Sequence, residues 1–454
     1  MRTPRPSRCA RRCPIALLLL LALPLADAPA ARAADWMRKQ PYLIYPGQPG
    51  QIKVLWQLTG TDTCRLAWGT DTTCSLGSVA SPEYGDDHQH AVTIEGLEPG
   101  TKYDYRETNE GYSYAGSFTS APAPDAARLK FFAYGDTRST PSEHDLVARG
   151  MVTRFQADPA FQTLTLQMGD YVTQGDNELY WTSDLFHPAY AYMHLLLGNL
   201  AYMGVMGNHE GSGVLYKKYL PYPFVAGRYW SFDYGPAHFA MVDQYTAWGA
   251  GSAQLDWLHN DLASSDKPWK FVVLHEPGWS SGAAHPNNVT VQTQIEPLCE
   301  QYGVAILFAG HNHNYCRAVV DGVQHITTGG GGAPPESPLP GQPNVVIAAG
   351  GGHFCTITID CGVLHFESIR SNGGSLIDSF TITRPFTDAS APSVRVTAPA
   401  AGAAWKAGSR HDITWSAADN VGVTSVDIDG SSDGGATWSP LLANAADAGT
   451  FAWA

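Results

Sequence analysis

The sequence predicts a multidomain protein in which a central α/β domain lies between an N-terminal β-sandwich and a partial C-terminal β-sandwich. Three observations predict this fold class. Polar and apolar residues alternate over residues 36–120, strand patterns alternate with helical patterns over residues 126–385, and residues 391–454 are rich in Ala, Gly, Ser and Asp. With 454 residues, of which 44% are hydrophobic, the chain can build several packed cores.

The amino end predicts a secretory signal peptide over residues 1–33. Five arginines between Arg2 and Arg12 precede an apolar run from Ile15 to Leu23, and Ala31-Arg32-Ala33 offers small residues for cleavage. The apolar run is about half as long as the roughly 20 residues of a membrane-spanning helix, so no stable membrane insertion is expected. We therefore expect a secreted protein, in a periplasmic or extracellular location.

The predicted mature chain is strongly acidic. The formal charge is -14, and residues 1–33 contain six Arg and one Asp, so their removal leaves a charge of about -19. This charge argues against general binding to nucleic acids or anionic membranes, because both are negatively charged. A small phosphorylated substrate must then be attracted by a local positive site.

Six cysteines remain after residue 33, and an even number in an exported chain predicts disulfides. Proximity in the sequence favours three pairs among the fifteen arrangements that six cysteines allow. These pairs are Cys64 with Cys74, Cys299 with Cys316, and Cys355 with Cys361.

Local patterns predict individual elements. Residues 51–57, 90–94 and 101–106 alternate as strands, and a Pro/Ala stretch at residues 120–125 reads as a linker. In the α/β region, apolar spacing predicts helices over residues 142–155 and 253–263. A hairpin is predicted around Gly235-Pro236, and four further strands are predicted at 323–328, 345–349, 355–360 and 363–368.

Five predicted strands of the α/β region each end in residues that can bind metals. The five junctions, by residue range, are 131–136, 163–170, 202–210, 270–275 and 304–314. They supply two carboxylates, one amide oxygen and three imidazoles, a donor set that suits Zn, Mn or Fe. His311 and His313 are two residues apart, so on extended backbone their rings point the same way. Histidines in a plain surface loop would not explain five such junctions in order.

This ordered series of Gly-Asp, Gly-Asp, Gly-Asn-His-Glu, Leu-His and Gly-His-Asn-His resembles the calcineurin-like metallophosphoesterase superfamily, in its purple acid phosphatase-like branch. The resemblance covers about residues 40–385, because Leu97–Tyr103 is similar to a turn and strand of fibronectin type III domains. It implies a fibronectin type III-like domain at 36–120 and a four-layer α/β/β/α domain at 126–385. Ser432–Trp438 resembles a hairpin of bacterial immunoglobulin-like modules. Because such modules need about 100 residues, 391–454 is expected to be a truncated one.

The resemblance implies two metal ions and assigns their ligands. The ions would be Fe, Zn or Mn, with Ca as a further candidate. The first metal would take Asp136, Asp170 and His313, and the second would take Asp170, Asn208, His275 and His311.

The resemblance also implies catalytic roles for His209 and His285, the position and charge of Arg138 suggest a third role, and the resemblance fails at two positions. His209 would bind phosphate or protonate the leaving oxygen, or it would only orient the backbone. His285 would contact substrate or lie in a plain surface loop, and Arg138 would clamp a phosphate oxygen or pair with a nearby acid. Thr173 stands where purple acid phosphatases have a metal-binding tyrosine, and Arg138 stands where other members of the superfamily have a histidine.

The function expected from these residues is that of a secreted phosphoric ester hydrolase, an acid phosphatase-like phosphomonoesterase. Two divalent metals, two Asp ligands and one bridging hydroxide leave a net charge of about +1, which attracts phosphate, and the hydroxide attacks phosphorus in line. A phosphodiesterase or nucleotidase could use the same site. Two further classes stay open, a non-catalytic surface protein with adhesion-type β modules and a hydrolase of non-phosphate esters.

Overall fold

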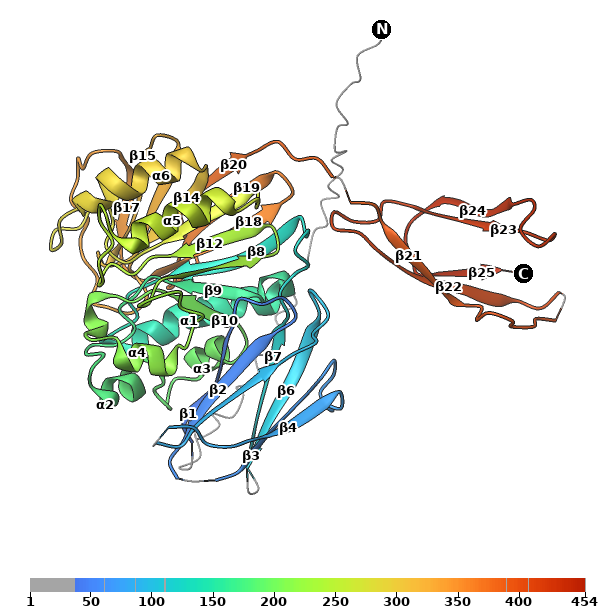
Figure 1. Ribbon diagram of the computed structural model, residues 1–454, viewed down its shortest axis with the longest axis horizontal. Helices are drawn as coiled ribbons and strands as arrows, with labels where there is room; N and C mark the ends of the chain where they lie inside the picture. Colours follow the sequence, from blue (N-terminus) through green and yellow to red (C-terminus); the bar gives the residue numbers. More distant parts are fainter. Residues whose placement is uncertain are drawn as a thin grey trace, which may run out of the picture. The chain divides into compact units, whose positions relative to one another are not determined.

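Two large β-sheets organise residues 37–388, and Figure 1 shows their strands. The structure is a computed structural model that describes residues 37–60, 62–85, 87–109, 112–388, 390–406 and 408–453. The predicted signal peptide, residues 1–33, lies outside the described residues. No helix in the described ranges is long and apolar enough to cross a membrane.

The first sheet has nine strands. Their order is β20 (Leu376–Thr383), β19 (Val363–Arg370), β18 (His353–Asp360), β8 (Arg128–Tyr134), β9 (Leu164–Gln167), β10 (Ala201–Gly204), β1 (Met37–Ile44), β2 (Ile52–Leu58) and β5 (Gln89–Ile94). Strands β8, β9 and β10 are parallel, and β1 joins β10 in parallel where Leu43 faces Ala201. The buried end of β1 pairs with β10 on one side and with β2 on the other. Strands β1, β2 and β5 of the predicted N-terminal domain therefore extend the sheet of the α/β domain.

The second sheet has seven strands. Their order is β11 (Trp230–Tyr234), β12 (Ala237–Met241), β13 (Trp269–Val273), β14 (Val304–Ala309), β16 (Val323–Thr328), β15 (Asn314–Val320) and β17 (Val345–Gly350). Strands β12, β13, β14 and β16 are parallel, and β11 and β12 form the hairpin that Gly235-Pro236 predicts.

Three smaller sheets complete the strands. A four-stranded sheet has the order β4 (Gly77–Ser81), β3 (Cys64–Gly69), β6 (Lys102–Asn109) and β7 (Tyr112–Thr119). Near the carboxyl end lie a sheet of β21 (Ser393–Ala398), β22 (His411–Ala418) and β25 (Thr450–Trp453) and a pair of β23 (Val426–Gly430) and β24 (Ser439–Ala445). The strands predicted at residues 51–57, 90–94 and 101–106 are confirmed as β2, β5 and β6.

The described helices are short except for α1 and α5. They are α1 (Pro141–Ala157), α2 (Glu178–Tyr180), α3 (Ala191–Leu197), α4 (Val214–Tyr219), α5 (Ala253–Ser264) and α6 (Glu296–Gln301). Short 3-10 helices are η1 (Pro159–Phe161) and η3 (Asn208–Glu210), and short π-helices are η2 (Trp181–Leu185) and η4 (Val291–Ile295). Pro141 starts α1, where its missing N–H costs nothing, and the Ser252 hydroxyl caps α5 by accepting the N–H of Leu255. Both predicted helices are confirmed within about two residues at each end.

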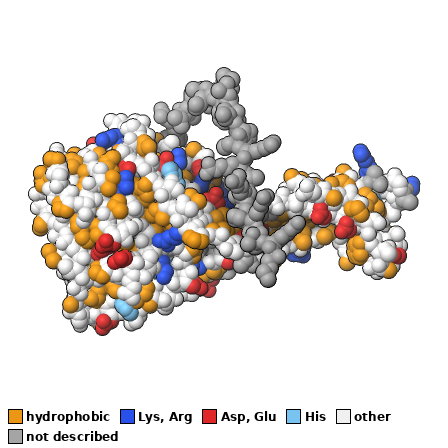
Figure 2. Space-filling model, turned by 90° about the horizontal axis from the view of Figure 1, so that it is seen from above, with side chains coloured by type: hydrophobic (Ala, Val, Ile, Leu, Met, Phe, Trp, Pro, Cys, Tyr) orange, Lys and Arg blue, Asp and Glu red, His pale blue; other side chains and the backbone are white. Residues whose placement is uncertain are grey.

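Aromatic side chains pack the two large sheets against each other. Phe131 of β8 meets Phe239 of β12 and Phe271 of β13 edge to face, with ring centroids 5.4 Å apart in both pairs. All three rings are fully buried, and burying a phenylalanine contributes about 1.5–3 kcal/mol. The surface differs from this core, since on the face drawn in Figure 2 Lys and Arg side chains are scattered among acidic and apolar ones.

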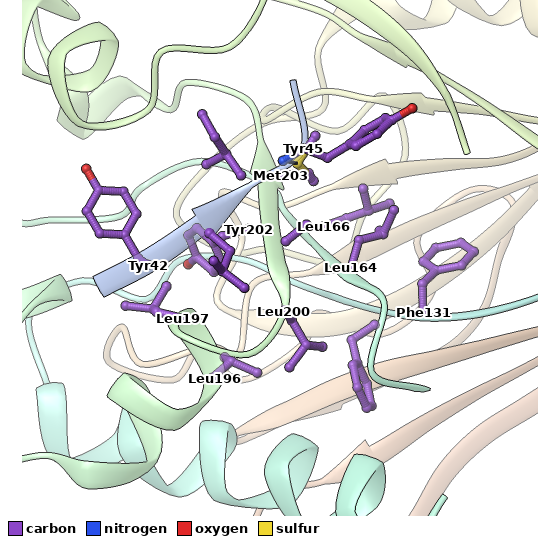
Figure 3. Close-up of a cluster of buried hydrophobic side chains, with 14 of the residues drawn as sticks. Tyr42, Tyr45, Phe131, Leu164, Leu166, Leu196, Leu197, Leu200, Tyr202 and Met203 are labelled. Carbon is purple, nitrogen blue, oxygen red and sulfur yellow. Dashed lines mark hydrogen bonds between the residues drawn. The ribbon is translucent and has the colours of Figure 1, made fainter. Parts of the chain in front are cut away.

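A second part of the core fixes β1 and β10. Figure 3 shows Tyr42 and Tyr45 of the β1 segment beside Tyr202 and Met203 of β10, and the backbone N–H of Tyr45 lies 3.3 Å from the Met203 sulfur. Leucines from α3 and the residues that follow it lie in the same cluster. On the seven-stranded sheet, Leu258 of α5 belongs to a separate apolar cluster with residues of β13 and β14.

The predicted disulfides do not form. Cys64, Cys74, Cys299, Cys316 and Cys355 carry free thiols, and each predicted pair includes at least one of them. Strand geometry explains two of the failures. Cys355 lies in β18 and Cys361 just past its end, and six residues of strand span roughly 20 Å, whereas a disulfide needs Cα atoms within about 7 Å. Cys64 starts β3, while Cys74 packs against Gly69 at the other end of that strand.

His238 of β12 makes the stability of the second sheet depend on pH. Its ring lies between two carboxylates, with Nδ1 2.8 Å from Asp233 Oδ1 and Nε2 2.8 Å from Asp261 Oδ2. Burial acts to lower the pKa of His238, but the two carboxylates outweigh it and raise the pKa from 6.5 to about 9. Because the folded pKa lies above the unfolded value, this stabilisation is complete below about pH 6.5 and is lost as the pH rises through about 9.

We expect the wild-type protein to lose on the order of 2 kcal/mol of stability from this group between about pH 6 and pH 10. His238→Gln removes the titrating group, so its stability should fall less over the same range. Thermal unfolding of both proteins across this pH range measures the difference. Parallel pH profiles for the two proteins would contradict the prediction.

Candidate metal centre

The six predicted metal ligands lie in segments that follow parallel strands. They are Asp136, Asp170 and Asn208, which follow β8, β9 and β10 of the nine-stranded sheet, and His275, His311 and His313, which follow β13 and β14 of the seven-stranded sheet. Because neighbouring strands in each set are parallel, their carboxyl ends meet at one edge of the sheet. Each sheet therefore contributes three of the six side chains.

Asp136, Asp170 and His313 form the first group of donors. One ligand atom from each lies within 4.8 Å of the others, and all three residues are buried. The His313 Nε2 atom is 3.7 Å from Asp136 Oδ1. Two carboxylates and one imidazole suit Zn, Mn or Fe, so the donor set fits a divalent cation.

The second group gathers around His275. Its Nε2 atom lies 3.1 Å from Asn208 Oδ1, 3.1 Å from His311 Nδ1 and 3.4 Å from Asp170 Oδ1. Asp170 therefore lies between the two groups, with Oδ1 toward His275 and Oδ2 toward Arg138. The structure brings all six predicted ligands together.

Hydrogen bonds to backbone carbonyls fix which nitrogen of two histidines can bind a metal. His275 Nδ1 lies 2.6 Å from the Met168 carbonyl oxygen, and His313 Nδ1 lies 2.9 Å from that of Pro334. Because a carbonyl only accepts, each Nδ1 carries the proton and donates. The lone pair of each ring is therefore on Nε2, the atom that faces the other donors.

Two histidines of the centre, His311 and His313, favour the neutral form that metals require. Burial lowers the pKa of His311 to about 2, with further lowering from His275 and His285. Burial and the Arg138 guanidinium lower the pKa of His313 to about 4. Both rings are therefore neutral near pH 7 and can each offer a lone pair.

The two carboxylates have pKa values shifted in opposite directions. Burial and the nearby charge of Asp170 raise the pKa of Asp136 well above its usual range. Burial acts to raise the pKa of Asp170 as well, but His275, His209 and Arg138 hold it below its usual value. Two buried carboxylates in one place repel each other, and a bound cation relieves this repulsion.

Strained backbone holds three of the ligands. Asp136, Asp170 and His311 have φ values of 58°, 58° and 69°, in the left-handed region that side chains other than glycine rarely adopt. Glycines make room beside them. A Cβ at Gly207 would collide with the Asp170 carboxylate, and a Cβ at Gly310 with that of Asp136. Local preference does not favour these conformations, so tertiary packing must maintain them.

Two of the three predicted catalytic residues border the second group. The His209 Nδ1–H donates to the Thr173 carbonyl oxygen at 2.7 Å, which turns Nε2 toward Asp170 Oδ2 at 3.8 Å. The side chain of His209 is 28% exposed, so a substrate could reach it. The His285 ring lies on that of His311, with centroids 3.9 Å apart.

Two segments of the chain match models of known families. Residues 151–315 match the calcineurin-like phosphoesterase family. The chain carries a calcineurin-like metallophosphoesterase domain. Five of the six predicted ligands lie inside the matched segment, and Asp136 precedes it. Residues 392–453 match a bacterial Ig domain, which confirms the immunoglobulin-like type predicted for the last segment.

Plant proteins are among the relatives of the metallophosphoesterase domain. Purple acid phosphatase 23 of Arabidopsis thaliana is 30% identical over 291 residues, which cover 54% of this chain and 62% of the relative. Purple acid phosphatase 21 of the same plant is 27% identical over 349 residues, which cover 69% of this chain and 75% of the relative. The chain thus spans somewhat less than two thirds of the first relative and three quarters of the second.

A solved structure supports the fold of the metallophosphoesterase region. The purple acid phosphatase PPD1 from yellow lupin (Lupinus luteus) seeds superposes with a TM-score of 0.64, covering 76% of this chain and 74% of that chain. The sequences are 19% identical, so the likeness concerns the fold.

No tyrosine takes the place of Thr173 as a ligand among the described contacts of the centre. The Thr173 hydroxyl donates to Asp184 at 2.7 Å. The nearest tyrosine in sequence, Tyr171, is fully buried and packs against Trp181 and Tyr202 in the hydrophobic core. The departure from purple acid phosphatases that the sequence indicates therefore remains in the folded metallophosphoesterase domain.

Glu210 is a positioning residue that sequence reasoning missed. Its carboxylate is fully buried and accepts the backbone N–H groups of Gly207 at 2.8 Å, Asp170 at 2.9 Å and Tyr171 at 2.8 Å. Glu210 thus ties the loop after β9 to the loop after β10 and so holds Asp170 beside Asn208. The signal was present in the sequence, because an acidic residue follows Asn208-His209 without having a ligand role of its own.

Proposed function

We propose that this protein is an exported phosphoric ester hydrolase with a dinuclear metal centre, and that it acts as an acid phosphatase-like phosphomonoesterase. The observation that carries the proposal is the position of Asp170, whose Oδ1 lies 3.4 Å from His275 Nε2 and whose carboxylate also lies within 4.8 Å of the donor atoms of Asp136 and His313. The match of residues 151–315 and the names of the plant relatives support the same reaction class.

The donor sets suit two ions of Fe, Zn or Mn, with Ca as a further candidate. Asp136, Asp170 and His313 would hold one ion, and Asp170 would share the second with the group around His275. When bound, the ions would polarise a phosphate oxygen and supply a bridging hydroxide for in-line attack at phosphorus. The protein itself contributes the neutral imidazoles, the shared carboxylate and the hydrogen bonds that fix both.

His209 is proposed as the general acid. Its Nδ1–H is held by the Thr173 carbonyl, so Nε2 is the atom that can give a proton to the leaving oxygen. The His285 ring packs against that of His311, with centroids 3.9 Å apart, and would contact the substrate. Arg138, whose side chain is 14% exposed, would bind a phosphate oxygen through its guanidinium.

The proposed substrate is a small phosphorylated molecule and not a nucleic acid. The net charge of -14 and the mixed surface in Figure 2 support this choice. We further propose that residues 36–120 form a fibronectin type III-like domain that buttresses the centre and that residues 126–385 form four α/β/β/α layers. The signal peptide over residues 1–33 would direct export.

A metal-reconstituted assay tests the proposal. Metal-stripped protein is reloaded with Mn²⁺ or Zn²⁺ and offered a phosphomonoester and a phosphodiester, in the wild type and in Asn208→Ala and His311→Ala. Both variants lose a donor of the second group, so we expect activity to fall at least about 100-fold. His259→Ala, an exposed histidine of α5, is the matched control and should keep wild-type activity.

Equal activity in the wild type, Asn208→Ala and His311→Ala would end the dinuclear proposal. Faster turnover of the diester would redirect it to a phosphodiesterase or nucleotidase. Failure of the loaded wild type on both esters would favour a non-catalytic surface protein with adhesion-type β modules.

A further inference from the structure

Arg138 lies inside the first group of donors rather than beside it. Its Nε–H donates to Asp170 Oδ2 at 3.0 Å, and an N–H of Nη2 donates to His313 Nε2 at 3.2 Å. A third donor, on Nη1, binds the Ser139 hydroxyl at 3.1 Å. The planar guanidinium therefore spans two of the three side chains that would hold the first metal.

The guanidinium and a metal ion require the same electron pair of His313. Because the Nδ1–H donates to the Pro334 carbonyl, Nε2 carries the single lone pair of the ring. That lone pair can accept an N–H from Arg138 or bind a cation, but it cannot do both. The Arg138 N–H that bonds Asp170 Oδ2 also places a positive charge against the carboxylate that the first metal would use.

The second group has no such competitor among the described residues. In the part of the chain that the structure describes, His275 Nε2 lies 3.1 Å from both Asn208 Oδ1 and His311 Nδ1, and no Lys or Arg nitrogen bonds to these atoms. Asp170 Oδ1 on that side accepts the backbone N–H of His209 and lies near His275. The two groups share Asp170 but differ in whether a cation of the protein is already bound to them.

We infer that Arg138 is a built-in competitor for the first metal, so that the two sites fill in order. The second site takes up its metal ion first and holds it tightly. The first site holds its ion more weakly, because that ion must displace the guanidinium. A displaced guanidinium keeps its charge, since arginine does not lose its proton in proteins, and it is then free to bind a substrate phosphate. This inference rests on the proposed dinuclear centre.

Electrostatics and geometry both support the order of filling. A guanidinium and a divalent cation at neighbouring positions repel each other, and the buried setting strengthens this repulsion. The Nε–H and Nη2–H groups of Arg138 also hold Asp170 and His313 in place before an ion binds. Filling the first site therefore exchanges one cation for another, whereas filling the second site adds a cation without removing one.

Stepwise metal binding tests the inference without an activity readout. Isothermal titration calorimetry with Mn²⁺ measures the affinity of each binding step in the metal-stripped full chain. The wild type, Arg138→Gln and Arg138→Lys are compared. We expect a second step in the wild type that is at least about 10-fold weaker than the first, and Arg138→Gln should strengthen it by about 10- to 100-fold, the usual range for residues that contact metal ligands. The first step should stay within about threefold.

Two comparisons make the result specific. Arg149→Gln removes one positive charge from an exposed position of α1 and should leave both steps unchanged. Arg138→Lys keeps the charge but cannot bridge two acceptors in a plane, so its second step should lie between those of the wild type and Arg138→Gln.

The outcomes separate this inference from the proposed function. An unchanged second step in Arg138→Gln, or two equally tight steps in the wild type, would overturn the competition while leaving a dinuclear centre. Binding of no ion, or of only one ion, by the wild type and Arg138→Gln alike would overturn the dinuclear centre itself.

Discussion

Asp170→Asn is expected to lower phosphatase activity by about 1000-fold or more and to abolish the stabilisation that added metal confers. The substitution keeps the volume of the side chain but removes the one charge that both donor groups share. Metal ions supply several kcal/mol of transition-state stabilisation in such centres, and about 4 kcal/mol corresponds to a 1000-fold loss of rate. Steady-state kinetics and thermal unfolding with and without Mn²⁺ measure the two effects.

Asp256→Asn is the control for this prediction, because it makes the same change of charge at an exposed position of α5. It should retain both the activity and the metal-dependent shift in melting temperature. If Asp170→Asn kept a wild-type shift on addition of Mn²⁺, Asp170 could not be the ligand common to both groups.

Glu210→Ala is expected to loosen the loops that present Asp170 and Asn208 and to cost about 3 kcal/mol of stability. The wild-type carboxylate accepts backbone N–H groups from two loops, and removing it leaves these buried donors without an acceptor. Each hydrogen bond lost to a buried N–H costs about 1–3 kcal/mol. Part of this cost is offset because the substitution also removes an unfavourable buried charge, as shown by the pKa of Glu210, which burial and the charge of Asp170 raise to about 8. Hydrogen exchange followed by mass spectrometry over residues 168–173 and 205–211 measures the local loosening.

We expect the amides of those two segments to exchange at least about 10-fold faster in Glu210→Ala, which corresponds to about 1.4 kcal/mol of local opening. Glu143→Ala, at an exposed position in the first turn of α1, should leave their exchange unchanged. Unchanged protection in Glu210→Ala would show that other contacts hold the loops.

The sequence predicted the convergence of the ligands because strand ends are easy to recognise. A buried apolar run followed by a glycine and a polar residue marks the carboxyl end of a strand, and parallel strands bring such ends to one edge. Asp136, Asp170 and Asn208 satisfy this pattern on one sheet, and His311 satisfies it on the other, where His275 follows its strand after Leu274 without a glycine. The family pattern supplied the division into two metal sites, which stays a prediction, and the structure places one ligand atom each of Asp136, Asp170 and His313 within 4.8 Å of the others.

What the sequence did not predict depends on contacts between segments that are distant along the chain. Arg138 was placed near the substrate, but its bond to His313 crosses 175 positions and has no local signal. The role of Glu210 depends on the backbone of the loop after β9, which a residue pattern does not display. The disulfide prediction was wrong because it used separation in sequence, whereas strands β3 and β18 carry nearby cysteines apart.

The division of the ligands between two sheets has a thermodynamic consequence. Three donors belong to the nine-stranded sheet and three to the seven-stranded sheet. Ions bound between them would therefore link the two sheets that Phe131, Phe239 and Phe271 pack together. The affinity for the ions and the stability of the packing between the sheets are then thermodynamically linked, so a change in one changes the other. Loosening the phenylalanines would weaken the hold on the ions without touching any group that binds them.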